Sequence, residues 1–515
     1  MRERRTLVSR NGSQIGKVYL IGAGPGDPGL FTLKGKTILE RADCVVYDYL
    51  ANEELLRFVR PGCEKIYVGK RGGAHTRSQA EINHLLVRKA REGRIVARLK
   101  GGDPFIFGRG GEEAEELVKG GIPFEVVPGI SSGYAATAYA GIPVTHRDFT
   151  SGVAFITGHE DPTKAETALD WSKIATGLGT LVFFMGVKNL PEIAGKLVEH
   201  GRDPGTPVAV IRWGTRAEQQ VVTGTLADIV SKAEGVPPPA ITVVGEVVRL
   251  RDRLNWFERL PLFGKRLVIT RTREQASVLG EALAELGAQV IEIPTIEIRE
   301  PASWQPLDQA IRRLEEFHYL LVTSANGVRS FLARLETCGR DVRDLKGLVI
   351  GAIGPATAAE FAKTGIKVDF VPKDYRAEGL LEALSGHDLQ GKSILIPRAK
   401  VARDLVPRAL KERGARVEVV EAYETVAPEF PPGELERLLT PLPDMITFTS
   451  SSTATNFAKL LGDRKLRDVL DGVAVASIGP ITSDTLRDLG LEVGLEAKES
   501  TIPGLVQAIR EHFRR

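Results

Sequence analysis

The stretch Leu99-Lys-Gly-Gly-Asp-Pro-Phe-Ile-Phe-Gly-Arg-Gly-Gly-Glu112 contains five glycines and one proline around a Phe-Ile-Phe centre. Glycine loses the most conformational entropy on folding, so this density indicates tight turns or a close approach of backbone to a ligand. Before it, Arg94–Leu99 is typical of a strand. After it, Glu112–Lys119 is typical of a helix with acidic residues in its first turn. A Gly-rich loop between strand and helix predicts an α/β fold with a small-molecule site at the loop.

Composition excludes several other classes of protein. The chain has 515 residues, 43% of them apolar and 26% charged, which predicts several soluble globular domains. The net charge is only +3 (69 − 66), so a nucleic-acid partner is not expected. The three cysteines, Cys44, Cys63 and Cys338, are odd in number and form no C-x-x-C pair. We therefore expect no disulfide, no metal site and a reducing, cytoplasmic compartment.

The N-terminal residues indicate neither export nor membrane insertion. Residues 1–16 are basic but lack an apolar segment, so we expect a loose extension and not a secretory signal. No apolar run approaches the roughly 18 residues that a membrane span needs. No membrane partner is expected.

A second Gly-rich loop, Gly22–Gly29, follows the short apolar strand Val18–Ile21. Its spacing departs from the dinucleotide pattern G-x-G-x-x-G, because Asp27 stands where the third glycine should be. An aspartate there would repel a pyrophosphate. The loop therefore predicts a ligand without phosphate, which argues against NAD.

Charged residues end two neighbouring predicted strands, Ala42–Asp48 and Lys65–Arg71. The carboxyl ends of parallel strands face one crevice, so Asp48 and Lys70 could supply a carboxylate and an ammonium for acid–base chemistry. Capping or a solvated charge is the alternative for each of them.

Seven ordered motifs between Lys17 and Trp256 resemble uroporphyrinogen-III C-methyltransferase, a tetrapyrrole methylase family with two α/β lobes. They are Gly22–Gly29, Val46–Tyr49, Val68–Arg71, Leu99–Glu112, Val127–Ser131, Gly141–Arg147 and Phe183–Gly186. The resemblance implies S-adenosylmethionine as methyl donor, with S-adenosylhomocysteine as product. This cationic cofactor lacks phosphate and agrees with the interpretation of the Gly22 loop.

The resemblance also implies roles for single residues. S-adenosylmethionine would contact Pro25, Gly101, Gly102, Asp103, Ile106, Ser131, Ser132, Met185 and Gly214. Asp48 matches the family's proton acceptor and Lys70 its proton donor. Because the substrate carries eight carboxylates, the motif cations Lys100, Arg109, His146 and Arg147 are candidates for binding it. A structural salt bridge is the alternative for each of these cations.

The C-terminal half repeats itself. Gly264–Ile269 matches Gly391–Ile396 at an offset of 127 (391 − 264). Two further pairs follow at offsets of 126 (449 − 323) and 125 (478 − 353). We therefore expect two copies of one α/β unit with parallel, flavodoxin-like sheets. Two lobes with a cleft between them suit a ligand that is bound from both sides.

Each copy carries a Thr-Ser loop that enters a helix, at Thr323 and at Thr449. Such loops offer backbone N–H groups and hydroxyls to an anion, with ordinary helix capping as the alternative. The half contains no catalytic triad, metal cluster or phosphate loop in its sequence. Any catalysis there would depend on shape and positioning.

Six short motifs in this half resemble uroporphyrinogen-III synthase. They are Ile269–Arg273, Val322–Val328, Ile394–Arg398, Ala422–Thr425, Phe448–Thr453 and Ser477–Pro480. The resemblance implies two lobes joined by a two-stranded ladder, here Pro294–Ile298 with Tyr423–Val426. It further implies Tyr423 as proton donor and a set of cleft residues for substrate carboxylates: Thr323, Ser324, Asn326, Arg398, Thr449, Ser450 and Ser451.

Together the two resemblances predict a bifunctional enzyme, with a possible homodimer formed through the methyltransferase half. It would cyclise hydroxymethylbilane to uroporphyrinogen III with inversion of ring D, then methylate the product twice to precorrin-2 for sirohaem or cobalamin-type tetrapyrroles. The alternative is a methyltransferase whose C-terminal half only binds or senses a tetrapyrrole. The expected parts are an extension 1–16, a methyltransferase 17–252 (lobes about 17–128 and 129–252), a linker 253–263 and a synthase 264–515 (outer lobe about 264–293 plus 427–515, inserted lobe about 299–422).

Overall fold

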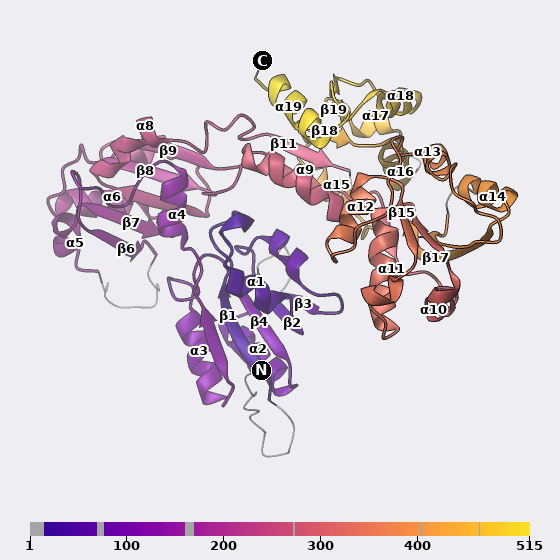
Figure 1. Ribbon diagram of the computed structural model, residues 1–515. Helices are drawn as coiled ribbons and strands as arrows, with labels where there is room; N and C mark the ends of the chain where they lie inside the picture. The colour runs from indigo at the N-terminus through magenta and orange to yellow at the C-terminus, as the bar shows by residue number, and fades with distance from the viewer. Residues whose placement is uncertain are drawn as a thin grey trace. The chain divides into compact units, whose positions relative to one another are not determined.

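The computed structural model describes residues 15–69, 77–159, 169–270, 273–401, 404–462 and 464–514, without the side chains of 273–277. The chain divides into two compact units (Figure 1). The first unit is Met1–Lys265 with Ala284–Gln289, and the second is Arg266–Leu283 with Val290–Arg515. Among the described residues, no helix has the length and hydropathy to cross a membrane.

The first sheet of the first unit is fully parallel, with strand order β3-β2-β4-β1-β5. Its strands are β1 (Lys17–Gly22), β2 (Cys44–Tyr47), β3 (Glu64–Tyr67), β4 (Ile95–Lys100) and β5 (Phe124–Val127). Alternate residues of β1 pack on opposite faces: Val18 and Leu20 lie on one face, Tyr19 and Ile21 on the other. The first face is covered by α2 (Gln79–Arg91) and α3 (Gly110–Lys119), the second by α1 (Leu33–Leu39).

The second sheet of this unit is mixed, with order β6-β7-β10-β8-β9. The strands are β6 (Val153–Thr157), β7 (Thr180–Phe184), β8 (Pro207–Arg212), β9 (Gln220–Thr225) and β10 (Ala240–Val244). One face packs on α4 (Ser132–Tyr139) and the other on α5 (Trp171–Gly177), α6 (Leu190–Glu199) and α7 (Ile229–Lys232). A short helix α8 (Arg251–Leu254) follows.

Two further sheets make up the second unit. One has the order β12-β11-β18-β19-β20, from β11 (Arg266–Ile269), β12 (Gln289–Glu292), β18 (Met445–Phe448), β19 (Ala474–Ser477) and β20 (Leu495–Glu496). The other has the order β13-β17-β16-β14-β15, from β13 (Glu297–Arg299), β14 (Tyr319–Val322), β15 (Val349–Ala352), β16 (Ser393–Ala399) and β17 (Arg416–Val426). When the strands of the sheet that contains β11 are numbered in chain order, their order in the sheet is 2-1-3-4-5. This is the flavodoxin-like order, so the flavodoxin-like prediction is confirmed. We call the lobe on this sheet the outer lobe, and the lobe on the other sheet the inner lobe.

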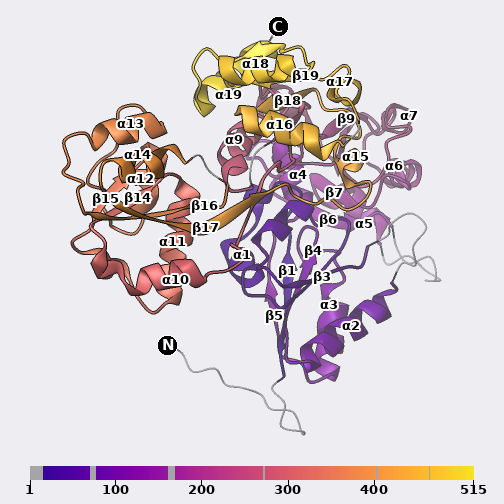
Figure 2. The ribbon, with the colours of Figure 1, turned by 90° about the vertical axis from the view of Figure 1, so that its right-hand side faces the viewer.

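Helices cover both faces of the inner-lobe sheet, as Figure 2 shows. Leu320 and Val322 of β14 pack on α10 (Gln305–Arg312), α11 (Ala325–Thr337) and α12 (Pro355–Ala362). Tyr319 and Leu321 face α13 (Ala377–Ala383) and α14 (Leu405–Glu412) on the other side. The outer lobe contains α9 (Arg273–Glu285), α15 (Glu434–Leu438), α16 (Ser451–Leu460), α17 (Leu466–Val469), α18 (Pro480–Asp488) and α19 (Ile502–His512).

The repeat detected in the sequence extends to the secondary structure. Start-to-start offsets are 127 for β11 and β16 (393 − 266), 126 for β14 and β18 (445 − 319) and 125 for α13 and α19 (502 − 377). We call 266–383 the first copy and 393–512 the second copy. The matched elements are β11 with β16, α9 with α14, β12 with the start of β17, α10 with α15, β14 with β18, α11 with α16, β15 with β19, α12 with α18 and α13 with α19.

The two copies do not coincide with the two lobes. The outer sheet takes β11 and β12 from the first copy but β18, β19 and β20 from the second. The inner sheet takes β14 and β15 from the first copy and β16 and β17 from the second. Matched strands nevertheless occupy matched positions, since β12-β11-β18-β19 corresponds to β17-β16-β14-β15. The copies have therefore exchanged their first strand-helix-strand segments.

An antiparallel ladder between β13 and β17 marks the point of exchange. Glu297 pairs with Val426, Ile298 with Thr425 and Arg299 with Glu424. Ile298 and Thr425 are themselves matched residues of the two copies (425 − 298 = 127), so the ladder is locally two-fold symmetric about this pair. The expected ladder is thus present at Glu297–Arg299, whereas Pro294–Ile296 lies before the strand.

Candidate active sites in the two units

Three glycine loops cross where β1 and β4 lie side by side in the first unit. Gly102 N–H donates to the Gly24 carbonyl at 2.7 Å, and Gly24 N–H donates to the Gly102 carbonyl at 3.2 Å. A Cβ on Gly22 would lie 2.4 Å from Gly129 Cα, so only glycine permits this crossing. The loops that follow β1, β4 and β5 therefore meet at the carboxyl edge of the sheet, where open α/β sheets bind ligands.

Asp103 holds two of these loops together. One of its carboxylate oxygens accepts a hydrogen bond from Phe105 N–H at 2.8 Å, and the other accepts from Gly129 N–H at 2.9 Å. The loop after β5 continues into Ser131, the buried N-cap of α4, and the half-buried Ser132. Pro25 and Ile106 are likewise half-buried on the loops after β1 and β4.

Strained backbone lines the same region. Five non-glycine residues of the described chain have positive φ, and all five follow strands of the first unit: Phe107, Arg109, Met185, Trp213 and Thr215. Positive φ costs energy in an L-residue and persists only where the surrounding structure imposes it, commonly at ligand sites. Met185 has a φ of 57° directly after β7, and 50% of its surface is exposed. An exposed thioether on strained backbone favours a role in binding.

The loop after β8 is attached to the loop after β1. Asp27 N–H donates to Thr215 Oγ1 at 3.0 Å, and Tyr139 Oη donates to the Asp27 carboxylate at 2.6 Å. Burial, together with this carboxylate, raises the pKa of Tyr139 well above its ordinary value. Gly214 lies behind the loop, where a Cβ would approach Ala136 Cβ to 2.3 Å. Asp27 thus joins the two lobes of this unit, donating through its backbone N–H and accepting through its carboxylate.

A buried charge cluster lies behind Asp48. Arg98 donates from Nη2 to the Asp48 carboxylate at 3.0 Å and from Nε to Glu113 Oε1 at 3.2 Å. Lys100 Nζ donates to the same Glu113 oxygen at 2.8 Å. Glu113 is fully buried, and its Oε2 has no hydrogen-bond partner among the described residues. The cluster fixes one carboxylate oxygen of Asp48, which lies directly after β2.

The position of Lys100 differs from the expectation of a substrate-binding cation. Its side chain is buried with Arg98 and Glu113, because residues two apart in β4 share one face. Desolvation and the positive charge of Arg98 lower the pKa of Lys100, and Glu113 opposes this shift. Lys100 therefore balances the charge of Glu113 in the interior.

The other candidate cations of this unit contact separate neighbours. Arg109 is exposed and donates to both carboxylate oxygens of Glu112 at 2.7 and 2.8 Å. The His146 ring lies tilted beside that of Phe149 with a centroid distance of 5.0 Å, and Arg147 is exposed. Lys70 lies outside the described residues.

In the inner lobe, candidate residues gather at the carboxyl ends of β14 and β16, where the strand order reverses. Thr323, Ser324 and Asn326 lie in the loop that enters α11, and Arg398 lies near the end of β16. Ser324 Oγ shares a hydrogen bond of 2.9 Å with Tyr423 Oη. The structure thus joins two residues that are 99 positions apart.

Two inner-lobe candidates have charged partners. Arg398 pairs with Asp404, and Asn326 Oδ1 accepts a hydrogen bond from Arg329. Both contacts lie at the same edge as Ser324. A ligand at this edge would compete with them.

In the outer lobe, Thr449, Ser450 and Ser451 follow β18 and enter α16. Thr449 is 9% exposed, and its hydroxyl has no partner among the described residues. Ser450 caps α16 by accepting from Thr453 N–H, and Ser451 Oγ bonds Thr485 Oγ1 at 2.8 Å. This loop is rich in hydroxyls but has no tyrosine equivalent to Tyr423.

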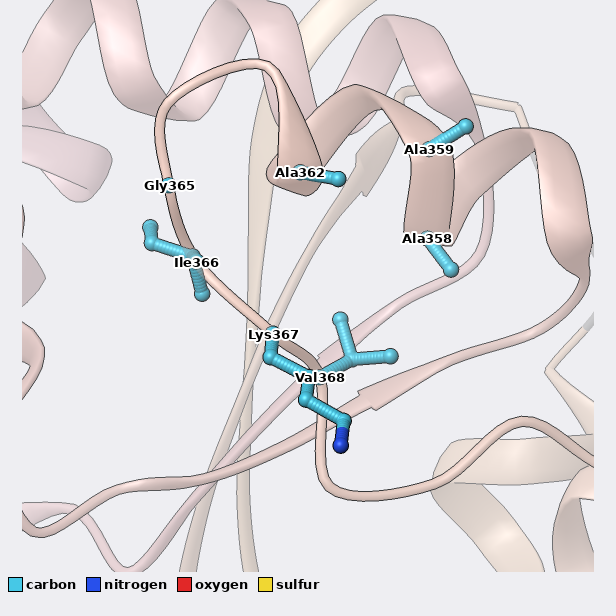
Figure 3. Close-up of a pocket in the computed structure, with 7 residues that line it drawn as sticks. All are labelled: Ala358, Ala359, Ala362, Gly365, Ile366, Lys367 and Val368. Carbon is cyan, nitrogen blue, oxygen red and sulfur yellow. The ribbon is translucent and has the colours of Figure 1, made fainter.

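A shallow cavity of about 380 Å³ lies elsewhere in the inner lobe (Figure 3). Its walls come from α12 and the loop that follows, with alanine, isoleucine and valine side chains and Lys367. It contains none of the candidate residues. We assign it no role in the two sites.

Sequence reasoning missed Arg98, Glu113 and Tyr139. A signal for the first existed, because Arg98 and Lys100 alternate with apolar residues in a strand that is otherwise buried. Buried cations need buried anions, and Glu113 in the following helix was the nearest carboxylate on a face expected to be apolar. The contact of Tyr139 with Asp27 spans two lobes and carries no local signal.

Comparison with known proteins finds two family models along the chain. Residues 17–230 match the family model described as tetrapyrrole (corrin/porphyrin) methylases, and residues 277–507 match the model described as uroporphyrinogen-III synthase HemD. The chain is 36% identical over 507 residues to a protein of Ruminiclostridium josui named porphyrin biosynthesis protein HemD, covering 96% of this chain and 98% of that protein.

Two further relatives are methyltransferases by name. A uroporphyrinogen-III C-methyltransferase of Bacillus subtilis is 44% identical over 371 residues, 72% of this chain and 75% of that protein. An S-adenosyl-L-methionine-dependent uroporphyrinogen III methyltransferase of Methanosarcina barkeri is 60% identical over 242 residues, 47% of this chain and 95% of that protein. The chain therefore belongs to the family in which a tetrapyrrole methylase is fused to a uroporphyrinogen-III synthase, and it is a bifunctional enzyme.

Proposed function

We propose that the first unit methylates uroporphyrinogen III twice and yields precorrin-2. The observation that carries this proposal is the meeting of the Gly22, Gly102 and Gly129 loops beside Asp48 at one sheet edge. The names of the Bacillus and Methanosarcina relatives support the same substrate. Precorrin-2 would then serve sirohaem or cobalamin-type pathways.

The residues of this region suit S-adenosylmethionine, which supplies an electrophilic methyl group when bound. Exposed Phe107 and Met185 offer apolar surface, and the loops carry the carboxylate of Asp103 and the hydroxyls of Ser131 and Ser132. Acceptor groups of this kind suit a cation with ribose hydroxyls and an amino group. We propose Pro25, Gly101, Gly102, Asp103, Ile106, Ser131, Ser132, Met185 and Gly214 as its binding residues.

Asp48 is the proposed proton acceptor of the methylation. Methylation of a pyrrole carbon leaves a cationic ring, and the proton at that carbon must then leave. Arg98 holds Oδ2 of Asp48, and Leu50 N–H donates to Oδ1 at 3.2 Å. These two hydrogen bonds fix the orientation of the Asp48 carboxylate. The proposed proton donor is Lys70, with Arg109, His146 and Arg147 as candidate cations for substrate carboxylates.

The second unit is proposed to cyclise hydroxymethylbilane. Tyr423 donates its hydroxyl proton to the leaving hydroxyl group, the C–O bond breaks and water departs. A carbon of ring D attacks the resulting electrophilic methylene, and a spiro intermediate rearranges so that ring D is inverted. The proton released as the macrocycle becomes neutral returns to the tyrosinate, which balances the reaction.

Six polar residues at the sheet edges are proposed to bind substrate carboxylates. Helix N-termini and hydroxyls stabilise anions, which supports the assignment. The residues are Thr323, Asn326, Arg398, Thr449, Ser450 and Ser451. Ser324, the seventh candidate from the sequence, bonds Tyr423 instead. We also propose the boundaries 17–252 and 264–515 for the two enzymes and a homodimer through the first.

Incubation of the full-length protein with hydroxymethylbilane, without and with S-adenosylmethionine, tests both proposals. We expect type III isomer alone in the first case and a dimethylated product in the second, by isomer analysis and mass spectrometry. Type I isomer, which forms spontaneously, would refute the synthase proposal. Direct supply of uroporphyrinogen III then tests the methyltransferase separately.

A further inference from the structure

Tyr423 owes its orientation to a β-bulge. In the pairing of β16 with β17, Arg398 faces Glu421 but Ala399 faces Tyr423, so Ala422 is an extra residue. Val420, Ala422 and Tyr423 all pack in the core beneath α11. Strict alternation would turn Tyr423 to the opposite face of the sheet. The bulge therefore directs the ring toward α11.

At the start of α11, Ser324 meets this ring. Gly327 N–H donates to Ser324 Oγ at 2.9 Å, and the same oxygen shares the 2.9 Å hydrogen bond with Tyr423 Oη. Because Oγ already accepts from the backbone, its own hydrogen is available to Tyr423. A hydroxyl that donates to Oη leaves the phenolic hydrogen directed away from Ser324.

We propose that Ser324 is a positioning residue that orients the hydroxyl of Tyr423 for proton donation, and that it does not itself bind a substrate carboxylate. This inference rests on the proposed synthase function. Only 8% of Tyr423 is exposed, so its hydroxyl has few alternative partners and Ser324 determines where its hydrogen points.

The outer lobe shows that a helix cap does not require this arrangement. Ser450, the match of Ser324 (450 − 324 = 126), bonds Ser452 Oγ at 2.9 Å and caps α16 through Thr453. The match of Tyr423 is Ile296 (423 − 296 = 127), which has no hydroxyl. The Ser–Tyr pair is therefore specific to the lobe that carries the proposed acid.

Steady-state kinetics of type III isomer formation with Ser324→Ala tests the inference. We expect kcat to fall about tenfold with KM nearly unchanged, since one orienting hydrogen bond is lost. Ser324→Thr keeps a hydroxyl and should restore most of kcat. Ser324→Ala should change kcat little further in a Tyr423→Phe background, because the two residues act as one unit.

Thr501→Ala provides the matched control for helix stability. Thr501 caps α19 by accepting from Gly504 N–H at 3.1 Å, as Ser324 does from Gly327, but no tyrosine of the described residues is bonded to it. We expect this variant to keep wild-type kinetics.

Three outcomes would overturn the inference. One is a rise in KM at constant kcat for Ser324→Ala, which would mean that Ser324 contacts substrate. The others are additive losses in the double variant, or a Tyr423→Phe enzyme with normal kcat. A wild-type enzyme that forms only type I isomer would instead refute the synthase function itself.

Discussion

The inner and outer lobes of the second unit share a strand order but begin their matched helices differently. In the outer lobe, Ser450 and Thr453 form a reciprocal capping box at α16. In the inner lobe, the position of Thr453 is taken by Gly327, and the cap residue Ser324 bonds Tyr423. The outer helix satisfies its polar groups locally, whereas the inner helix directs one of them toward the proposed acid.

The interiors of the lobes differ in a complementary way. Gly351 lies beside Phe370 in the inner lobe, where the outer lobe pairs Ala476 with Leu495 at an offset of 125 (476 − 351, 495 − 370). A small residue thus accompanies a large one in each lobe. The duplicated fold has kept its total core volume at this position while its sequence diverged.

The largest expected effect is on catalysis, which we assign to Tyr423 of the inner lobe. Tyr423→Phe removes the proposed proton donor, and we expect type III isomer formation to slow about 100-fold, the scale of general acid catalysis. Methylation of added uroporphyrinogen III should be unchanged. Isomer analysis by chromatography measures the first activity and S-adenosylhomocysteine release the second.

Tyr319→Phe is the control for Tyr423→Phe. Tyr319 is also buried in the inner lobe, and its hydroxyl shares a hydrogen bond of 3.1 Å with His387 Nδ1 on the other face of the sheet. We expect normal isomer formation from this variant. Equal rates of type III isomer formation in both variants would show that Tyr423 is not the proton donor.

Exchange of core residues between the lobes should alter stability by a smaller amount. In Gly351→Ala, the new Cβ would lie 2.4 Å from Phe370 Cζ, so we expect a loss of about 1–3 kcal/mol in unfolding free energy. Adding Phe370→Leu recreates the outer-lobe pair and should recover most of it. Urea unfolding checks both steps, and a double variant no more stable than Gly351→Ala would contradict the matching of the lobes.

A polar contact of the inner lobe should make the stability of this lobe more sensitive to acid than that of the outer lobe. Arg334 donates to both carboxylate oxygens of Asp308 at 2.5 and 2.6 Å and lowers the pKa of Asp308. The matched residues are Leu435 and Leu460 (435 − 308 = 127, 460 − 334 = 126), both in the outer core. A depressed carboxyl pKa stabilises the fold above the unfolded value of about 3.9, and this contribution is lost as the pH falls below it.

Replacing Asp308 and Arg334 together by leucine tests this difference. Between pH 7 and about pH 3, we expect the stability of the double variant to improve relative to wild type by on the order of 1 kcal/mol. Hydrogen exchange of inner-lobe peptides at the two pH values measures the change. A constant difference across this range would show that the ion pair contributes nothing to acid sensitivity.

The smallest effect concerns the outer helix cap. Thr453→Ala removes the side chain that accepts from Ser450 N–H at 3.3 Å, and we expect a loss of about 0.5 kcal/mol. Amide exchange at the start of α16 should rise while α11 stays unchanged. Faster exchange in α11 as well would indicate that the two helix starts are coupled.

Local patterns predicted most of the architecture. Strand-to-loop-to-helix transitions and the constant offset of the repeat identified two α/β units and flavodoxin-like sheets. The exchange of segments between copies could not be predicted from the repeat, because an offset shows which residues correspond and not which strands pair. The hydrogen-bond registers of β11 with β18 and of β14 with β16 show the exchange.

The candidate sites were predicted unevenly for a similar reason. The role of the glycines in the Leu99–Glu112 loop could be predicted from the sequence, since conformational freedom is a property of glycine itself. The burial of Lys100 was not, because it depends on Glu113 in the next helix. The partner of Tyr423 was also hidden, since a bulge at Ala422 changes the face on which the ring lies.

The exchanged segments determine the order in which the two lobes can fold during protein synthesis. The ribosome delivers β11 and β12 first, but their neighbour β18 begins at Met445, 153 residues after β12 ends (445 − 292). The inner lobe is complete once β17 has emerged at Val426. Until β18 emerges, the apolar residues Leu267, Val268 and Ile269 of β11 lack this neighbouring strand, a state in which nascent chains aggregate or bind chaperones. The last lobe to close is thus the one whose first strand was made earliest.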